Sequence, residues 1–182
     1  TGGPKALQSV IPRLPAELAA PVLIVQHMPK GFTKSLAERL DSLSKMKVKE
    51  AEEGDVIENG TVYISMGGKH MNVVTKGGRA VIAYTDEPAR EGVKPCANYM
   101  YESLMTCDYD EVVCVVMTGM GADGTEGIEN LKTKKKIHVI TQEKDTCAVY
   151  GMPKSVDQAG LSNQQVALDK IAQEVILAVG VK

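Results

Sequence analysis

The sequence lacks several features that common binding modes require. It has no tryptophan and a single phenylalanine in 182 residues, so we expect no aromatic platform on which nucleic acid bases could stack. Its formal net charge is -2, which favours neither nucleic acid nor an anionic membrane surface as a partner. No apolar run approaches the roughly 20 residues that a membrane span needs, so we expect no membrane insertion.

Closely spaced cysteine pairs are also missing. The four cysteines are Cys96, Cys107, Cys114 and Cys147, and no two of them form a C-x-x-C pair. This spacing argues against a zinc site or a redox dithiol, and it favours reduced, mostly buried thiols in a cytoplasmic protein. We therefore expect no metal and no cofactor.

The remaining composition is that of a globular domain. Hydrophobic residues make up 43% of the chain and charged residues 24%, which suits one domain with a sizeable core. Apolar, β-rich runs at 21–27, 112–116 and 137–141 alternate with amphipathic helical segments. This alternation predicts an α/β fold with a doubly wound, mostly parallel sheet flanked by helices.

One region departs from this alternation. Residues 47–85 contain four short β-prone segments separated by glycine-rich turns: 47–51, 61–65, 71–75 and 79–84. Such a series is typical of strands joined by tight turns. We therefore predict an antiparallel hairpin insertion around residues 47–85, beside the parallel sheet.

The first residues, Thr1-Gly2-Gly3-Pro4, have the character of a loop that leads into a helix. An apolar stripe of Leu7, Val10, Ile11 and Leu14 follows. In an α/β fold a strand normally leads into such a loop. We therefore expect the first strand of the domain to be absent from this sequence.

A glycine-rich stretch, Met117 to Gly124, follows the run Val112–Val116 and precedes a helical segment. Its spacing Gly119-x-Gly121-x-x-Gly124 fits the dinucleotide-binding fingerprint, and Glu143 lies near the position of a ribose-binding acid. Asp123, however, would place a negative charge beside a pyrophosphate. A nucleotide-binding α/β module is therefore one hypothesis, and an acid that holds a histidine is another.

His27 supplies the histidine for that second hypothesis. His27 and Asp123 both follow predicted parallel strands, and the carboxyl ends of such strands meet at one sheet edge. His27 would be a general base that Asp123 orients, and backbone N–H groups of Gly119–Gly121 would form an oxyanion hole. A short distance between His27 and Asp123 would favour this hydrolase over the nucleotide module.

This hypothesis needs a nucleophile, and the chain offers poor ones. Ser9 and Ser35 fall within predicted helices. Cys147 is a conceivable nucleophile near a strand end, but a small buried residue is the preferred interpretation because no base is evident beside it. His70 and His138 are interpreted as structural.

Four ordered motifs carry a resemblance across essentially the whole chain: Thr-Gly-Gly-Pro at 1–4, Val-Gln-His-Met-Pro at 25–29, Thr-Gly-Met-Gly-Ala-Asp-Gly at 118–124, and Tyr-Gly-Met-Pro at 150–153. They resemble the catalytic domain of the CheB-type chemotaxis receptor methylesterases. The resemblance implies hydrolysis of glutamate methyl esters on methyl-accepting chemoreceptors, with glutamine deamidation as a further activity, in cytoplasmic two-component signalling.

The resemblance also assigns residues. His27 and Asp123 match two members of a Ser-His-Asp triad, the backbone of Met120 matches the oxyanion hole, and Thr1 matches the residue directly after the serine. It implies that residues 1–182 are a catalytic domain whose serine, first strand and N-terminal receiver domain precede the given sequence. Residues 93–98 depart from the family pattern, which affects substrate contacts there. A remnant that docks on receptors without catalysis is a third hypothesis.

Overall fold

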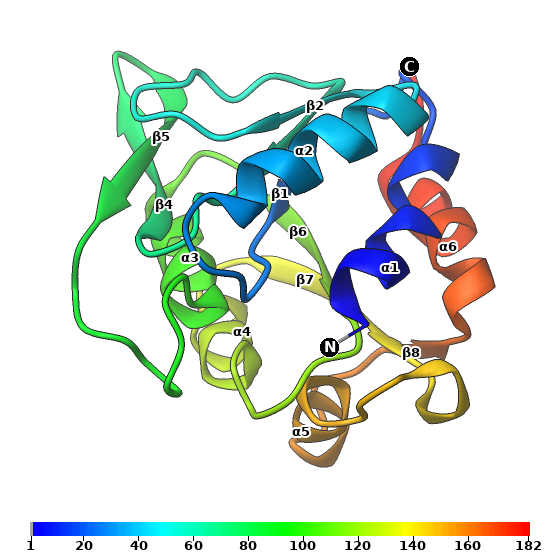
Figure 1. The fold of residues 1–182 in the computed structure, drawn as a ribbon. Coiled ribbons are helices and arrows are strands. Elements are labelled where there is room, and N and C mark those ends of the chain that lie inside the picture. The colour runs from blue at the N-terminus through cyan, green and yellow to red at the C-terminus, as the bar shows by residue number, and fades with distance from the viewer. Residues whose placement is uncertain (1) are drawn as a thin grey trace.

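Helices cover both faces of a mostly parallel β-structure in the computed structural model, which describes residues 2–182 (Figure 1). The strands are β1 (Val22–Ile24), β2 (Lys47–Glu50), β3 (Thr61–Ile64), β4 (His70–Lys76), β5 (Arg79–Thr85), β6 (Glu111–Val116), β7 (Lys136–Gln142) and β8 (Gln164–Val166). The α-helices are α1 (Gly3–Gln8), α2 (Phe32–Leu43), α3 (Ala97–Ser103), α4 (Thr125–Lys132), α5 (Met152–Gln158) and α6 (Ile171–Val179). The α/β class predicted from the sequence is confirmed.

The parallel strands form two groups. In one, β3 lies between β1 and β2, and in the other β7 lies between β6 and β8, with all these pairings parallel. Central strands of this kind are buried on both faces and are therefore apolar throughout. β3, which lies between two neighbours, is buried at all four of its positions.

The predicted insertion is smaller than residues 47–85. Only β4 and β5 form an antiparallel hairpin, closed by Gly77 and Gly78, whose φ angles are 58° and 78°. These values suit the two-residue turns that match strand twist. The segments 47–50 and 61–64 instead run parallel to β1, and β3, which lies between β1 and β2, is buried along its whole length.

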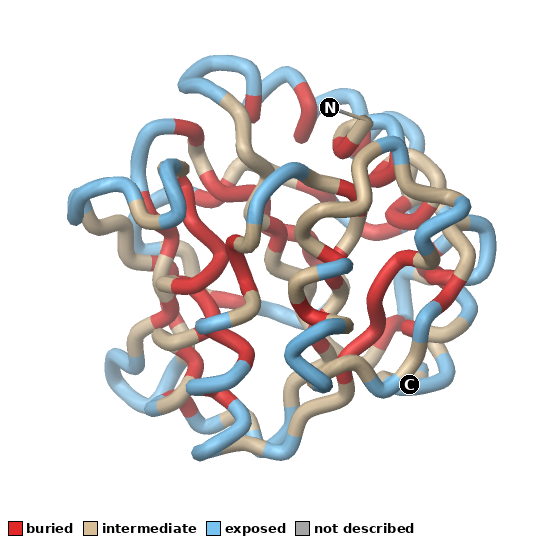
Figure 2. The backbone as a smooth tube through the Cα atoms, turned by 90° about the horizontal axis from the view of Figure 1, so that it is seen from below, coloured by how far each residue is buried: buried red, intermediate tan, exposed pale blue. Residues whose placement is uncertain are grey.

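The core has two parts, one on each face of the parallel strands. Side chains alternate across β3: Val62 and Ile64 pack with α1, α2 and α6, whereas Tyr63 packs with α3, α4 and α5. Figure 2 shows the buried backbone running through the interior, enclosed by exposed turns. Because successive side chains of a strand point to opposite faces, each face of the sheet is covered by its own layer of helices.

Strands β1 and β6 are edge strands of their respective parallel groups. No ladder among residues 2–182 joins these strands, and Val22, Leu23, Val113 and Val115 remain only partly buried. Residues at the start of α1 contact the loops that leave both strands. An added Cβ on Gly2 would lie 2.8 Å from the Ala148 Cβ and 3.9 Å from the Thr118 Cγ2, and one on Gly3 would lie 2.5 Å from the Gln26 Nε2.

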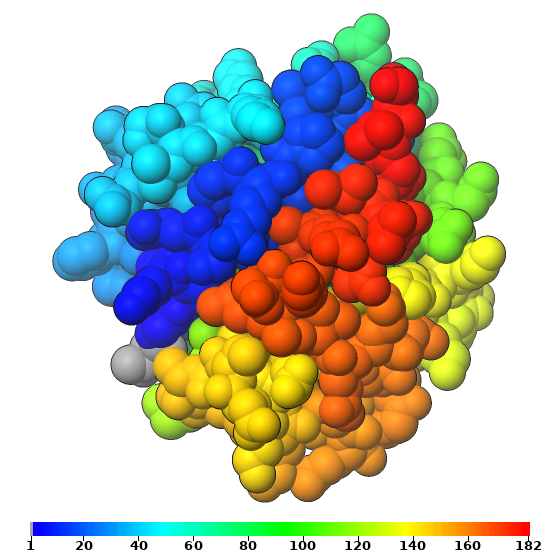
Figure 3. Space-filling model, turned by 90° about the vertical axis from the view of Figure 1, so that its right-hand side faces the viewer, coloured from blue at the N-terminus to red at the C-terminus, as the bar shows by residue number. Residues whose placement is uncertain are grey.

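Segments from opposite ends of the chain lie side by side. Figure 3 shows α6 next to the segment that follows α1. An isolated antiparallel bridge joins Leu18 to Val181, and the Arg13 Nη1 donates to the Asp169 carbonyl oxygen at 3.0 Å. Among residues 2–182, no helix combines the length and the apolar character needed to cross a membrane.

Gly127→Ala tests the contact between α3 and α4. A Cβ on Gly127 would lie 2.7 Å from the Asn98 Cα and 2.8 Å from the Asn98 carbonyl oxygen. Alanine normally favours a helix by about 1 kcal/mol over glycine, but this contact reverses the sign. We expect a loss of about 1–3 kcal/mol in the free energy of unfolding, measured in urea.

Glu129→Ala is the matched control, because Glu129 is exposed on the same helix. It should change the free energy of unfolding by less than about 0.5 kcal/mol. If Gly127→Ala stabilised the protein, the close packing of α4 against α3 would be wrong.

Candidate active site

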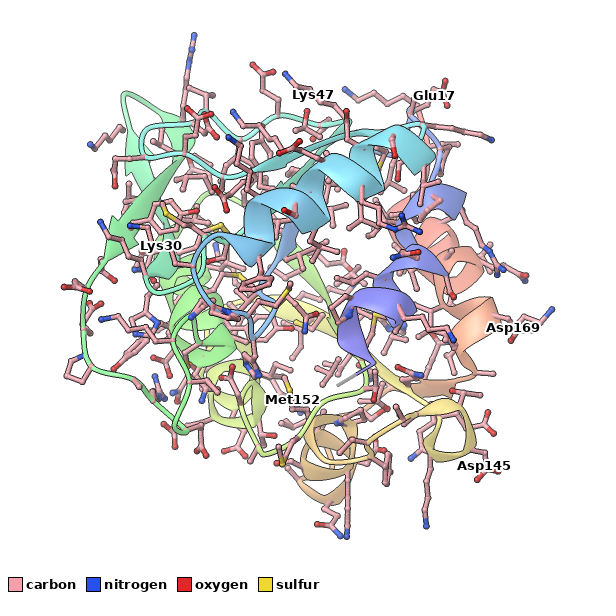
Figure 4. The ribbon with its side chains drawn as sticks, in the orientation of Figure 1. Glu17, Lys30, Lys47, Asp145, Met152 and Asp169 are labelled. Atoms are coloured by element: carbon pink, nitrogen blue, oxygen red, sulfur yellow. The ribbon has the colours of Figure 1, made fainter. Side chains whose placement is uncertain are left out.

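The candidate residues gather at the carboxyl edge of the parallel strands. Lys47, the first residue of β2, marks the opposite edge, and Met152 lies at the carboxyl edge in Figure 4. His27 is in the loop after β1, which ends earlier than predicted, at Ile24. Asp123 is in the loop between β6 and α4. This is the edge at which open α/β sheets place their ligands.

His27 and Asp123 are in direct contact. The His27 Nε2 lies 2.6 Å from the Asp123 Oδ2, and the side chains are 21% and 2% exposed respectively. The two residues come from different parallel groups and are 96 positions apart in the sequence. The structure therefore brings the predicted base and acid within hydrogen-bonding reach, with the histidine facing solvent and the acid behind it.

Asp123 is also held by the start of α3. The Ala97 N–H donates to Oδ2 at 2.7 Å, the Asn98 N–H donates to Oδ1 at 3.0 Å, and the Cys96 Sγ–H donates to Oδ1 at 3.1 Å. Burial by itself raises the pKa of Asp123, but the hydrogen bonds from His27, Ala97 and Cys96 outweigh it and hold that pKa below its usual value. The carboxylate is therefore ionised at neutral pH.

Asn98 connects the start of α3 to the start of α4. Its Oδ1 accepts hydrogen bonds from the Gly124 N–H at 3.0 Å and the Gly127 N–H at 2.8 Å. These amides belong to the first turn of α4, where helical N–H groups lack partners within the helix. One side chain thus fixes the start of α4, directly after Asp123, against the start of α3.

An ionised Asp123 determines the tautomer of His27. A carboxylate only accepts hydrogen bonds, so the His27 Nε2 carries the proton that it donates. The Nδ1 atom is then the basic nitrogen of the neutral ring. Any proton that His27 removes from a nucleophile must go to Nδ1.

The glycine-rich loop presents Met120 to solvent. The Met120 side chain is 75% exposed, although it is large and apolar. Within residues 2–182, no acceptor is bonded to its backbone N–H. The Thr118 N–H at the base of the loop donates to the buried Gln142 Oε1 at 2.8 Å. The loop is therefore anchored at Thr118 and leaves the Met120 N–H available. Thr1, the other predicted site residue, lies outside the described residues.

Sequence reasoning missed the part played by Cys96. Burial, followed by the neighbouring Asp123 charge, raises the pKa of the Cys96 thiol to about 12, so it remains a hydrogen-bond donor at neutral pH. Cys96 lies in the segment 93–98, where the sequence departs from the family pattern. That departure was the only signal available, because two residues 27 positions apart show no shared pattern in sequence.

The other candidates occupy structural positions. Burial raises the pKa of the Cys147 thiol to about 11, which leaves little thiolate for nucleophilic attack. The buried His70 Nε2 lies 3.1 Å from the Glu87 carbonyl oxygen, and the His138 Nε2 lies 2.7 Å from the Gln164 Oε1. Residues 2–182 contain no cluster of three or more His, Cys, Asp or Glu side chains that could hold a metal ion.

Comparisons with known proteins agree on one family. A family model described as CheB methylesterase matches residues 1–175. The crystal structure of the Thermotoga maritima CheB methylesterase catalytic domain matches with a TM-score of 0.93 and 39% sequence identity, over 98% of this chain and 94% of that chain.

Two longer relatives carry the name protein-glutamate methylesterase/protein-glutamine glutaminase. The protein of Geobacillus kaustophilus is 45% identical over 180 residues, which are 99% of this chain and 52% of the relative. The protein of Bacillus subtilis is 46% identical over 177 residues, 96% of this chain and 49% of the relative. The chain thus spans about half the length of the curated relatives it matches.

Asp123→Asn should destabilise the fold in a pH-dependent way. Because the pKa of Asp123 is lower in the folded than in the unfolded chain, its charge stabilises the fold at neutral pH, and this contribution is lost as pH falls through the folded-state pKa. An asparagine amide also places a donor against the donors that surround Asp123. We expect a loss of about 1–3 kcal/mol at neutral pH.

Urea unfolding at neutral pH and at about pH 3 measures this effect. The difference between wild type and Asp123→Asn should shrink at the lower pH. Asp145→Asn is the control, because Asp145 is exposed, and it should change stability little at either pH. A difference for Asp123→Asn that does not vary with pH would contradict the assigned ionisation.

Proposed function

The chain belongs to the CheB methylesterase family, and we propose that it is a hydrolase that removes methyl groups from glutamate methyl esters of chemoreceptors in the cytoplasm. The observation that carries this proposal is the 2.6 Å contact between the His27 Nε2 and the Asp123 Oδ2, at the edge where the sequence motifs place a triad. Glutamine deamidation, named in the relatives, is a second activity open to the same groups.

The nucleotide-binding alternative is not favoured. Its glycine loop would have to cradle a pyrophosphate with free backbone N–H groups. Here the acid of that loop, Asp123, is buried and bonded by His27 and the start of α3. The Gly124 N–H is also taken by Asn98.

The proposed reaction proceeds through an acyl-enzyme. The His27 Nδ1 accepts the proton of a serine hydroxyl while the serine oxygen attacks the ester carbonyl carbon. The tetrahedral intermediate collapses, the C–O bond to the methoxy group breaks, and methanol leaves with the proton from Nδ1. Water then loses a proton to Nδ1 and attacks the acyl carbon. The second tetrahedral intermediate collapses, the bond between the acyl carbon and the serine Oγ breaks, and the proton on Nδ1 passes to Oγ, which releases the receptor glutamate and restores the serine.

The remaining groups stabilise charge in this scheme. Asp123 keeps His27 in the Nε2–H tautomer and stabilises the imidazolium that forms. The Met120 N–H, exposed in the loop after β6, stabilises the oxyanion of the tetrahedral intermediate. No metal or cofactor is part of this scheme.

We place the serine directly before Thr1, at the carboxyl end of a strand between β1 and β6. These two strands share no ladder among the described residues, and the start of α1 contacts the loops that leave both of them. A strand there would run between the two parallel groups, and its last residue would face His27. Its Oγ should lie about 2.6–3.5 Å from the His27 ring.

The extra length of the relatives suits a further domain ahead of this strand. Residues 1–182 are then one catalytic domain, and an N-terminal receiver domain regulates it. Methyl-accepting chemoreceptors are its proposed substrates.

His27→Ala in the full-length protein, with the segment before Thr1 present, tests the proposal. Methanol release from membranes that hold methylated receptors should become undetectable, because the variant lacks the side chain that accepts the proton of the serine. The fold should persist, since His27 is partly exposed and Asp123 keeps its bonds to α3.

His138→Ala is the matched control. His138 is also partly exposed, but it lies on β7 and bonds Gln164. It should release methanol at the wild-type rate. A folded His27→Ala protein with wild-type turnover would refute the role of His27 as the base.

Met120→Ala should cost much less than His27→Ala. The proposed donor is the backbone N–H, which alanine retains, whereas loss of a true oxyanion donor costs roughly 10² to 10³ in rate. Methanol release under saturating substrate measures the difference. A loss as large as 10²-fold, without a shift of the loop, would indicate that the side chain rather than the backbone acts there.

A further inference from the structure

The motif Tyr150-Gly151-Met152-Pro153 lies beside the loop that carries Met120, but the proposed reaction gives it no part. Just before it, the Val149 N–H donates to the Thr118 Oγ1 at 2.9 Å, and the Val149 carbonyl oxygen accepts from the Gly119 N–H at 3.1 Å. Gly119 and Tyr150 form an isolated parallel bridge. The two segments are therefore paired through their backbones, far apart though they are in sequence.

The carbonyl oxygen of Gly119 receives two hydrogen bonds from the start of α5. The Gly151 N–H donates to it at 3.1 Å and the Met152 N–H at 2.9 Å. A carbonyl oxygen has two lone pairs, so both are used. This oxygen belongs to the same peptide unit as the Met120 N–H.

That shared peptide unit determines where the Met120 N–H points. The peptide bond is planar, and in its trans form the C=O and N–H groups point in opposite directions. Holding the Gly119 oxygen against Gly151 and Met152 therefore turns the Met120 N–H away from α5. The direction of the oxyanion donor is set by a neighbouring segment, not by the methionine side chain.

Glycine at position 151 makes this close approach possible. A Cβ there would lie 2.7 Å from the Gly119 carbonyl oxygen, 3.0 Å from the Gly121 nitrogen and 3.2 Å from the Met120 Cα. The φ angle of Gly151 is −107°, which any L-residue adopts without strain. Glycine is therefore needed for the contact and not for the backbone conformation.

We propose that Gly151 is a positioning residue for the oxyanion hole. Its missing side chain allows two backbone donors of the 151–152 segment to hold the Gly119 carbonyl, and through that peptide they aim the Met120 N–H at the reacting oxygen. The inference rests on the proposed function, because it assumes that an ester oxyanion forms at this site. The motif at 150–153 thus acts on catalysis without touching the substrate.

Gly119 and Gly151 differ in how well each position would tolerate a side chain. A Cβ on Gly119 would come within 2.5 Å of the Met152 Sδ, which is the end of a flexible side chain at this edge (Figure 4). The three atoms nearest to a Cβ on Gly151 are all backbone atoms of the loop. Substitution at Gly151 must therefore displace the loop itself.

Gly151→Ala in the full-length protein should lower kcat for methanol release by about 10- to 100-fold, because a misplaced catalytic group costs up to about 10²-fold. The KM for methylated receptors should stay within about twofold, since an oxyanion donor acts mainly in the transition state. An unchanged kcat, or a loss confined to KM, would overturn the inference.

Gly60→Ala separates this effect from a general loss of stability. Gly60 lies in the turn before β3 with a φ of +84°, so alanine there costs about 1–2 kcal/mol of backbone strain. We expect wild-type kcat from this variant. A kcat as low as that of Gly151→Ala would overturn the positioning role, because stability alone would then explain both.

Amide hydrogen exchange in the wild-type protein tests the contact if Gly151→Ala does not fold. The Gly151 and Met152 amides should exchange slowly, because both donate to Gly119. Rapid exchange of both would overturn the inference. If wild-type full-length protein released no methanol, the proposed function would fail and this inference with it, whereas equal kcat for wild type and Gly151→Ala would overturn this inference alone.

Discussion

The buried carboxylate of Asp123 is the group on which the site depends. A charge that is 1% exposed costs several kcal/mol unless donors surround it, and here the donors come from separate parts of the chain. His27 reaches it from the loop after β1, and Cys96, Ala97 and Asn98 reach it from the start of α3. The same contacts that compensate burial of the charge therefore hold His27, the loop after β6 and α3 in one arrangement.

Close backbone contacts extend this arrangement beyond the charged groups. Gly127 lets α4 approach α3 near Asn98, and Gly151 lets the start of α5 approach the loop of Met120. At both places the lack of a side chain allows two segments to approach closely, and hydrogen bonds from the glycine N–H groups hold them together. The direction of the Met120 N–H, the donor in the proposed reaction, therefore depends on a neighbouring segment and not on the methionine side chain.

Much of the architecture was predictable because it is local. Apolar runs identified β6 and β7, and the rule that ligands meet the carboxyl ends of parallel strands brought His27 and Asp123 to one edge. The orientation of β2 and β3 was not predictable in this way, because parallel or antiparallel pairing depends on the neighbouring strand rather than on the segment itself. The contacts of Cys96 with Asp123 and of Gly151 with Gly119 were also missed. Each joins residues that are far apart in the sequence, and neither contact leaves a periodic pattern in the sequence.

The candidate site is divided between the two parallel groups of strands. His27 follows β1 and the loop of Met120 follows β6, yet no ladder among residues 2–182 joins these strands. A strand paired to both would satisfy the backbone groups along their facing edges. Because its carboxyl end would emerge between the two loops, its last residue would lie between the base and the oxyanion donor. In the proposed enzyme, the position of the serine therefore follows from the sheet topology, and the pairing that stabilises the sheet also assembles the triad.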